Sequence, residues 1–341
     1  MTHQSHHMIK EIREEPQAAA YVLKDEHVKE LAEALSSSDR VFFFGCGSSY
    51  NMALYGARVA EVLEVGVEAY ALPSSEFTYF LGKLRRGDLA VAISRSGETS
   101  ETLKAAMGAL KAGAKLFSIT NEPASPLARA SHAYVLMGGG REESVVMTKT
   151  FVAGSLSILR ALKMCAGGDV GRELPSRLWE LIETHEPLLK DFSREFAEAR
   201  LAVNLGHSYT HPMALEASIK VMEAALIPAI TYHMMEFRHG PKALVEPGVY
   251  VLALLVEDPH YELHRDLLEE VSSLGAKVVL ITNGEGLGDV VVKIGVKDPL
   301  EAAVLTITPV HLLAYYSALR KGLDPDRPRH LSKVVKVRGL N

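Results

Sequence analysis

Hydroxyl-bearing residues cluster around one glycine after the apolar residues 89–93, and this cluster is the first candidate for chemistry. Its members are Ser94, Arg95, Ser96, Gly97, Glu98 and Thr99. A helical pattern begins at about Glu98, and at the start of a helix the unpaired backbone N–H groups and the positive end of the macrodipole favour an anion. The hydroxyls and the guanidinium would add donors. The segment predicts a phosphate site, with an ordinary Ser/Thr helix cap as the alternative.

Three charged residues share one side of a later helical segment. Glu216, Lys220 and Glu223 are spaced i, i+4 and i+7. Such spacing often marks a solvated salt-bridge face, which is the alternative here. The surrounding segment 213–230 is too apolar for a surface helix, so we interpret the stripe as a functional acid–base group.

Two further candidates lie in less regular segments. His239 precedes Gly240-Pro241 in a turn, where an imidazole can face a cleft. Lys333 lies in a proline-rich and charged tail after a helix predicted from about Leu300 to Lys321. An exposed loop and a frayed tail are the alternatives. No HExxH, Walker or GxGxxG pattern occurs, so we expect neither a metal site nor a cofactor.

Short apolar runs alternate with helical patterns through the first half of the chain. These runs predict strands at 41–44, 67–72, 89–93 and 115–120. Uninterrupted apolar strands that alternate with helices predict a parallel sheet covered on both faces. Ligands bind such sheets beyond the carboxyl ends of the strands, which is where the serine-rich cluster falls.

The second half of the chain repeats the first. Residues 111–121 match residues 273–283 at an offset of 162, and two further landmarks keep nearly that offset. The repeat predicts a duplicated α/β unit. Where the first copy has Ser94 to Gly97, the second has Leu254 to Glu257, so only the first copy keeps the phosphate loop.

These patterns predict an α/β protein with two duplicated domains, each a parallel sheet flanked by helices. The expected divisions are a helical arm at 1–35, a phosphate-binding domain at 36–165, a helical connection at 166–195, a domain with the acid–base residues at 196–325, and a tail at 326–341 that closes the active site.

The composition restricts the class of protein. A chain of 341 residues, 48% hydrophobic and 23% charged, can form two domains with full cores. The net charge of −5 and the lack of a basic run with aromatics predict no nucleic-acid partner. We expect a cytoplasmic protein without a membrane segment, since the N-terminus is not signal-like and no apolar run reaches about 18 residues. Cys46 and Cys165 fit neither a disulfide framework nor a zinc site.

Several of these motifs together resemble the sugar isomerase (SIS) family. They are Gly45 to Tyr50, Ser94 to Thr99, Ala214 to Glu223, His239-Gly240-Pro241 and the tail to Lys333. From about Ile9 to Val337 the chain is similar to the isomerase half of glutamine-dependent glucosamine-6-phosphate synthase. It is more similar to standalone SIS-type glucosamine-6-phosphate deaminases, because Arg95 stands where the synthase has glutamine. The resemblance implies two SIS domains, each a flavodoxin-like three-layer α/β/α structure.

The resemblance also implies roles for single residues. Contacts to the phosphate and the neighbouring sugar hydroxyls would come from Ser49, Ser94, Arg95, Ser96, Thr99 and the backbone of Val145. Glu223 would move a proton between C1 and C2. His239 would open the sugar ring from the partner subunit of a homodimer with a shared active site. Lys333 matches a synthase lysine that forms a Schiff base, and Lys220 would orient the sugar or Glu223.

The implied activity is the conversion of a phosphorylated amino sugar, glucosamine 6-phosphate, to fructose 6-phosphate and ammonia. The chain begins at the isomerase-like region, so we expect no glutaminase and no ammonia from glutamine. Three alternatives stay open: an aldose–ketose phosphate isomerase, synthesis of glucosamine 6-phosphate with ammonia from a separate glutaminase, and a non-catalytic sugar-phosphate sensor.

Overall fold

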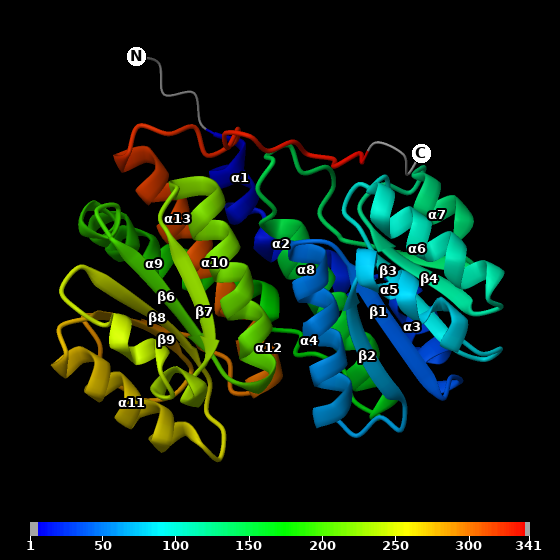
Figure 1. The fold of residues 1–341 in the computed structure, drawn as a ribbon, viewed down its shortest axis with the longest axis horizontal. Helices are drawn as coiled ribbons and strands as arrows, with labels where there is room; N and C mark the ends of the chain where they lie inside the picture. The colour runs from blue at the N-terminus through cyan, green and yellow to red at the C-terminus, as the bar shows by residue number, and fades with distance from the viewer. Residues whose placement is uncertain (1–5, 338–341) are drawn as a thin grey trace. The chain divides into compact units, whose positions relative to one another are not determined.

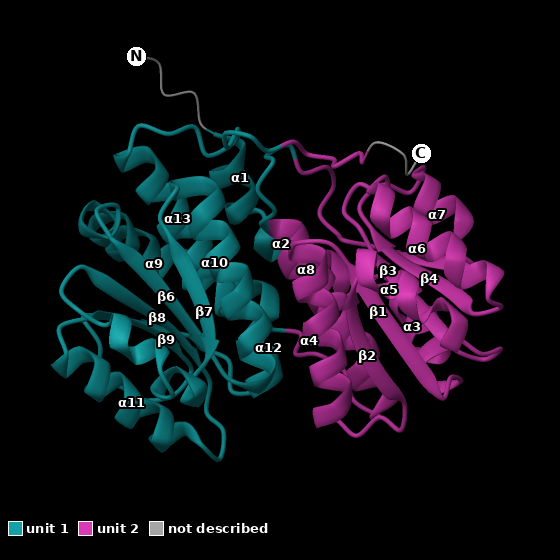
Figure 2. Cartoon of the chain, in the orientation of Figure 1, with its two compact units in different colours: residues 1–16, 143–148, 173–331 teal, residues 17–142, 149–172, 332–341 magenta. Residues whose placement is uncertain are grey.

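The computed structural model describes residues 6–337, so the outermost parts of the predicted arm and tail, residues 1–5 and 338–341, lie outside the described residues. The chain forms two compact units, each assembled from separate stretches of sequence (Figure 2). Unit 1 comprises residues 1–16, 143–148 and 173–331, and unit 2 comprises residues 17–142, 149–172 and 332–341.

Unit 2 is built on a parallel sheet in the order β2-β1-β3-β4-β5. Its strands are β1 (Arg40–Gly45), β2 (Glu68–Pro73), β3 (Leu89–Ile93), β4 (Lys115–Thr120) and β5 (Ala133–Leu136). Its helices are α3 (His27–Ser36), α4 (Ser48–Val62), α5 (Ser74–Phe77), α6 (Ser100–Lys111), α7 (Pro126–Ala130) and α8 (Lys149–Cys165), with a 3₁₀ turn at Thr78–Lys83.

Unit 1 contains a second parallel sheet, in the order β10-β9-β8-β6-β7. Its strands are β6 (Leu201–Gly206), β7 (Ala229–His233), β8 (Val249–Leu255), β9 (Lys277–Thr282) and β10 (Val290–Lys293). Its helices are α1 (His7–Arg13), α9 (Leu174–Phe196), α10 (His211–Ala225), α11 (Tyr261–Ser273), α12 (Pro299–Leu305) and α13 (Ile307–Arg320). Short 3₁₀ turns lie at Ser208–Thr210, Met235–Arg238 and Pro241–Leu244, and α2 (Glu15–Val22) crosses the division between the units.

The two sheets confirm the predicted fold class and the duplication (Figure 1). Read from its other edge, the second sheet has the order β7-β6-β8-β9-β10, which is the order of the first with each strand replaced by its repeat. This strand order is that of flavodoxin-like folds, in which ligands bind where the order reverses, between the first and third strands. The corresponding places are the carboxyl ends of β1 and β3 in unit 2, and of β6 and β8 in unit 1.

The apolar runs form strands because helices cover both faces of each sheet. In β1, Phe42 and Phe44 pack into a core with Phe77 of α5 and the alanines of α6. Phe43 points to the opposite face, where its ring lies beside Gly56 of α4. The side chains on both faces of β1 are therefore buried. This explains why residues 41–44 are all apolar, instead of alternating between apolar and polar.

Three sequence predictions differ from the structure. The helical arm expected at 1–35 consists of three helices, and the last of them ends at Ser36. The helix expected from about Leu300 to Lys321 is divided between α12 and α13. α6 begins at Ser100 rather than at about Glu98, because Thr99 is extended (φ −61°, ψ 120°) and the Glu98 N–H donates to the Ser96 hydroxyl.

The segment Pro299–Arg320 corrects the expectation that no part of the chain is apolar and long enough to span a membrane. Among the described residues this one helical segment meets the length and composition of a spanning helix. However, 94% of its most apolar window is buried inside the protein. Such burial is typical of a core helix, whose apolar surface is already covered by its own protein.

Candidate functional site

The serine-rich loop after β3 is held in shape by its own backbone and hydroxyl groups. The Gly97 N–H donates to the carbonyl oxygen and the hydroxyl of Ser94, both at 3.1 Å, and the Glu98 N–H donates to Ser96 Oγ at 3.2 Å. The hydroxyls of Ser94 and Thr99 lie 3.3 Å apart. The loop therefore places the predicted hydroxyls together at the start of α6 before any ligand binds.

Gly97 is required at its position for two reasons. Its φ of +61° lies in the left-handed region, which side chains other than glycine rarely adopt. A Cβ atom there would also lie 2.2 Å from the hydroxyl oxygen of Ser125. The tight turn after Ser96 thus depends on the absence of a side chain.

The loop after β1, which contains Ser49, lies at the same edge of the sheet. Phe44 pairs with Ala92 in the β1–β3 register, so both strands end side by side. Cys46 Sγ lies 3.8 Å from the Thr102 hydroxyl of α6, which joins the two loops. Ser49 is buried at the start of α4. Unit 2 therefore brings five of the six predicted contacts to one end of its sheet, whereas Val145 belongs to unit 1.

A cavity of about 320 Å³ opens beside this loop within unit 2. Arg95, Ser96 and Lys333 of the predicted set line it, together with Asn121 and Glu142. An arginine, a lysine, a serine hydroxyl and an amide suit a phosphate ester. The sequence analysis missed Asn121 and Glu142. Asn121 is the last residue of the segment 111–121 that matches 273–283. That match could have indicated that Asn121 follows a strand.

The segment after Lys333 is anchored on the same loop rather than frayed. The Ser100 N–H donates to the Val335 carbonyl at 3.5 Å, and the Val337 N–H donates to the Ser100 hydroxyl at 3.3 Å. The Lys336 ammonium lies 3.3 Å from the Glu98 carboxylate. These contacts fix the backbone on the far side of Lys333 and explain how a tail residue comes to line the cavity.

The second set of predicted residues lies on α10 in unit 1. Glu216 and Lys220 are fully buried, and the Glu223 side chain is 28% exposed. The Lys220 ammonium lies 3.1 Å from a Glu216 oxygen and donates to Glu223 Oε2 at 2.9 Å. Burial opposes the charge of Lys220, but attraction by the two carboxylates outweighs it and raises the pKa of Lys220. Lys220 is therefore an ammonium that orients Glu223. Of the side chains of Glu216, Lys220 and Glu223, only that of Glu223 reaches solvent.

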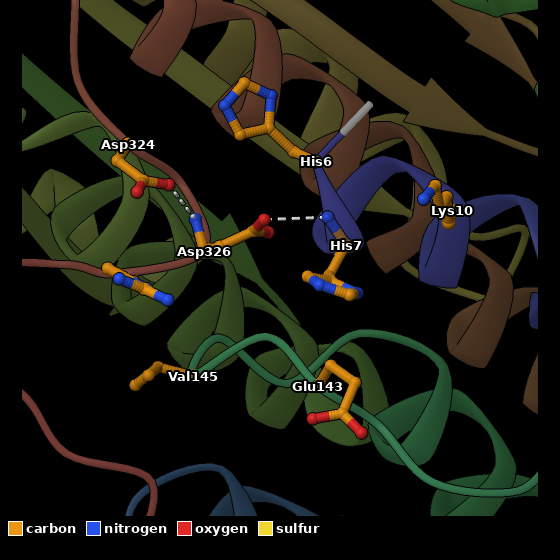
Figure 3. A pocket seen from close by; sticks show the side chains of 8 residues that line it. His6, His7, Lys10, Glu143, Val145, Asp324 and Asp326 are labelled. Atoms are coloured by element: carbon orange, nitrogen blue, oxygen red, sulfur yellow. Dashed lines mark hydrogen bonds between the residues drawn. The ribbon is translucent and has the colours of Figure 1, made fainter. Parts of the chain in front are cut away.

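His239 and Val145 also belong to unit 1. The His239 side chain is exposed, and among the described residues its imidazole makes no hydrogen bond. Val145 lines a cavity of about 630 Å³, and its N–H donates to the Asp326 carbonyl at 3.2 Å. Figure 3 shows Val145 and Glu143 on one side of this cavity, and His7 on the other with its N–H donating to the Asp326 carboxylate at 2.7 Å.

Removing two hydroxyls tests the phosphate loop. The double variant Ser96→Ala, Thr99→Ala removes two donors but keeps Gly97 and the turn. We expect its Kd for glucitol 6-phosphate to rise about 100-fold or more, since each of the two lost hydrogen bonds to a charged group weakens binding by about 1.5–3 kcal/mol. Isothermal titration calorimetry measures this Kd. Ser131→Ala, on a loop hydroxyl that donates to the Leu127 carbonyl, is the control, and an unchanged Kd in the double variant would argue against the site.

The corresponding edge of the second sheet carries imidazoles instead of a serine loop. His207 follows β6, and Asp258, His260 and His264 follow β8. The rings of His207 and His264 are 4.5 Å apart, and His264 is fully buried with no hydrogen-bond partner for either ring nitrogen. Among the described residues, no group of three or more His, Cys, Asp or Glu side chains is arranged to hold a metal ion.

This histidine cluster predicts an acid-sensitive unit 1. Burial lowers the pKa of His264 to about 4, with His207, His260 and Arg238 acting in the same direction and Asp258 opposing them. The unfolded chain, with a histidine pKa near 6.5, therefore binds a proton that the folded protein does not. The contribution of neutral His264 to the free energy of unfolding is complete above about pH 6.5 and is lost as the pH falls towards 4. At pH 5 the loss is about 2 kcal/mol.

Urea unfolding at pH 8 and pH 5 measures this effect. The single tryptophan, Trp179, lies on α9, so its fluorescence reports on unit 1. In His264→Leu, the decrease in the free energy of unfolding from pH 8 to pH 5 should be smaller by about 2 kcal/mol. His330→Gln changes an exposed histidine of the same unit and should leave this decrease unchanged. An equal pH dependence in His264→Leu and the wild type would contradict the prediction.

Comparison with known proteins gives a consistent result. A family model described as "SIS domain" matches residues 34–164 and 195–287. Glutamine–fructose-6-phosphate aminotransferase (isomerizing) of Sulfurisphaera tokodaii is 33% identical over 340 residues, which are 97% of this chain and 56% of the relative. The Thermotoga maritima enzyme of that name is 34% identical over 363 residues, with 97% and 59% covered. The chain thus spans little more than half the length of these relatives.

A solved structure is similar over almost its whole length. The glucosamine-6-phosphate deaminase from Thermotoga maritima shares 31% identity at a TM-score of 0.78, with 96% of this chain and 99% of that chain covered. The chain is therefore similar along its length to proteins with two differently named activities.

Proposed function

The chain belongs to the SIS domain family of phosphosugar isomerases, and from this premise we propose that it is an aminosugar-phosphate deaminase that converts glucosamine 6-phosphate to fructose 6-phosphate and ammonia. The observation that carries the proposal is the Glu216–Lys220–Glu223 arrangement on α10, where a buried ammonium orients one partly exposed carboxylate. A base positioned in this way suits proton transfer between neighbouring carbons. The serine-rich loop of unit 2 would bind the phosphate.

The proposed reaction proceeds in balanced steps. His239 opens the sugar ring and exposes the aldehyde at C1. Glu223 takes the proton from C2 and returns it to C1, while O1 gains a proton and the amine nitrogen loses one, so that C1 becomes an alcohol and an imine remains at C2. Water adds to the imine carbon, and ammonia leaves as the C2 ketone of fructose 6-phosphate forms. Lys333, in the cavity beside Arg95, would orient the open-chain sugar.

We also propose a cytoplasmic homodimer in which each His239 serves the partner's site. The exposed side chain of His239 supports this part of the proposal, because an imidazole at the surface can contact a second subunit. Mixing a His239→Ala protein with a Glu223→Gln protein should restore part of the activity if the site is shared. Two variants that stay inactive when mixed and reassociated would contradict the sharing.

Synthesis is a second candidate, favoured by the names of the relatives, which are aminotransferases rather than deaminases. In this case the chain would use ammonia delivered by another protein or segment. Both directions share the proton transfer, so the same residues of α10 would act. Synthesis is tested by adding ammonium and fructose 6-phosphate to the protein and measuring the glucosamine 6-phosphate that forms.

One assay tests the proposed function. The purified protein is incubated with glucosamine 6-phosphate, and ammonia and fructose 6-phosphate are measured together. We expect both products in equal amounts, and none from galactosamine without phosphate. A protein that binds sugar phosphates but releases no ammonia would not be a deaminase, and would point to an isomerase with another substrate.

A further inference from the structure

Arg95, at the phosphate loop, is paired with an acidic residue from a distant part of the sequence. Its guanidinium Nη1 donates to Glu142 Oε2 at 3.0 Å. The Glu142 side chain is fully buried, and that of Arg95 is only 10% exposed. An ion pair so far removed from water is held in one geometry, in contrast to an exposed pair.

Glu142 is itself fixed by the start of α8. The Thr150 N–H lies 3.4 Å from Glu142 Oε1, and the Thr150 hydroxyl donates to Oε2. A carboxylate at the start of a helix is stabilised by the free N–H groups and the macrodipole. The neighbouring Lys149 ammonium donates to the carbonyls of Gly139 and Arg141, which holds the preceding loop in place. Glu142 is thus held in place by contacts within unit 2.

The backbone of Arg95 is fixed as well. The Asn121 N–H donates to the Arg95 carbonyl at 2.9 Å, and the Thr120 hydroxyl donates to the same oxygen at 3.2 Å. Both ends of this long side chain are therefore held, the backbone by β4 and the guanidinium by Glu142. A flexible arginine would lose much of its rotamer freedom when it bound a ligand.

From these contacts we propose that Glu142 is a positioning residue for binding of the phosphate ester, acting through Arg95. It holds the guanidinium in the wall of the 320 Å³ cavity, so that the phosphate meets donors that are already oriented. This inference rests on the proposed phosphate-binding function of the loop. It concerns binding alone, and it holds for a deaminase, an isomerase or a sensor.

A double-mutant cycle tests whether Glu142 acts through Arg95. The Kd for glucitol 6-phosphate, which lacks the carbonyl and the amine, is measured by calorimetry for the wild type, Glu142→Gln, Arg95→Met and the double variant. We expect Glu142→Gln alone to raise the Kd about tenfold, and Arg95→Met to raise it at least as much. In the Arg95→Met background, Glu142→Gln should change the Kd less than about twofold.

Two results would overturn the inference. One is a Kd that Glu142→Gln leaves unchanged, and the other is an equal increase in both backgrounds, which would show that Glu142 acts on folding or on another group. Glu61→Gln removes the carboxylate of an exposed arginine–glutamate pair in the same unit and should leave the Kd unchanged. If Glu142→Gln does not fold, Glu142→Asp, which keeps the charge but withdraws the carboxylate, should raise the Kd by a smaller factor, and an unchanged Kd there overturns the inference.

The cycle also separates this inference from the proposed function. With glucosamine 6-phosphate as substrate, Glu142→Gln should raise KM and change kcat less than about threefold, because the proposed role of Glu142 is in phosphate binding and not in proton transfer. If the wild-type protein binds glucitol 6-phosphate but releases no ammonia, the deaminase proposal is wrong. The double-mutant cycle can still be interpreted in that case, because it measures binding alone. Wild-type protein that binds neither glucitol 6-phosphate nor inorganic phosphate would overturn the positioning role.

Discussion

Glu223→Gln is expected to lower the rate of ammonia release from glucosamine 6-phosphate by about 10²- to 10⁴-fold, the usual contribution of a general base. Glutamine has nearly the same size and still accepts a hydrogen bond from the Lys220 ammonium, 2.9 Å from the present carboxylate oxygen. It cannot take a proton from C2. The change thus removes the chemistry and keeps the geometry of α10.

Binding distinguishes a lost base from a damaged site. The Kd of Glu223→Gln for glucitol 6-phosphate should stay within about threefold of the wild-type value, because the phosphate loop belongs to residues 94–99 of unit 2. Glu183→Gln, an exposed carboxylate on α9 of unit 1, should keep full activity. Near-normal turnover in Glu223→Gln would show that another group moves the proton.

The fold was predictable because its signals are local. Strands β3 and β4 have the predicted bounds, and β1 and β2 differ from theirs by one residue at each end. β1, β3 and β4 are mostly apolar and are buried on both faces, which is typical of the inner strands of a parallel sheet. β5 was not predicted, although Ala133–Leu136 is apolar; the strand has only four residues and is partly buried.

The site was predictable only where its residues adjoin one another in the sequence. The spacing of Glu216, Lys220 and Glu223 places them on one helix side, and the structure confirms that two of them are buried there. The partner of Arg95 was not predictable, because Glu142 is 47 residues away and is brought in by the fold of unit 2. No periodicity relates a loop residue to such a partner.

Lys220→Met should destabilise unit 1 by about 3–5 kcal/mol, the usual effect of removing one partner from a buried ion pair. Methionine fills similar space, but the fully buried Glu216 carboxylate loses the ammonium that now lies 3.1 Å away. Trp179 fluorescence during urea unfolding measures the change in unit 1. Arg194→Met, which breaks an exposed pair with Asp191 in the same unit, should cost less than about 1 kcal/mol.

The pH dependence of the Lys220→Met defect identifies its cause. Without the ammonium, the buried carboxylate of Glu216 favours its protonated form in the folded state, so the folded variant binds a proton more readily than the unfolded chain. The loss of stability relative to the wild type should therefore be largest at pH 8 and become smaller towards pH 5. Adding Glu216→Gln removes the buried negative charge and should restore stability at pH 8. A defect of equal size at both pH values, unaffected by Glu216→Gln, would mean that lost packing rather than the buried charge destabilises α10.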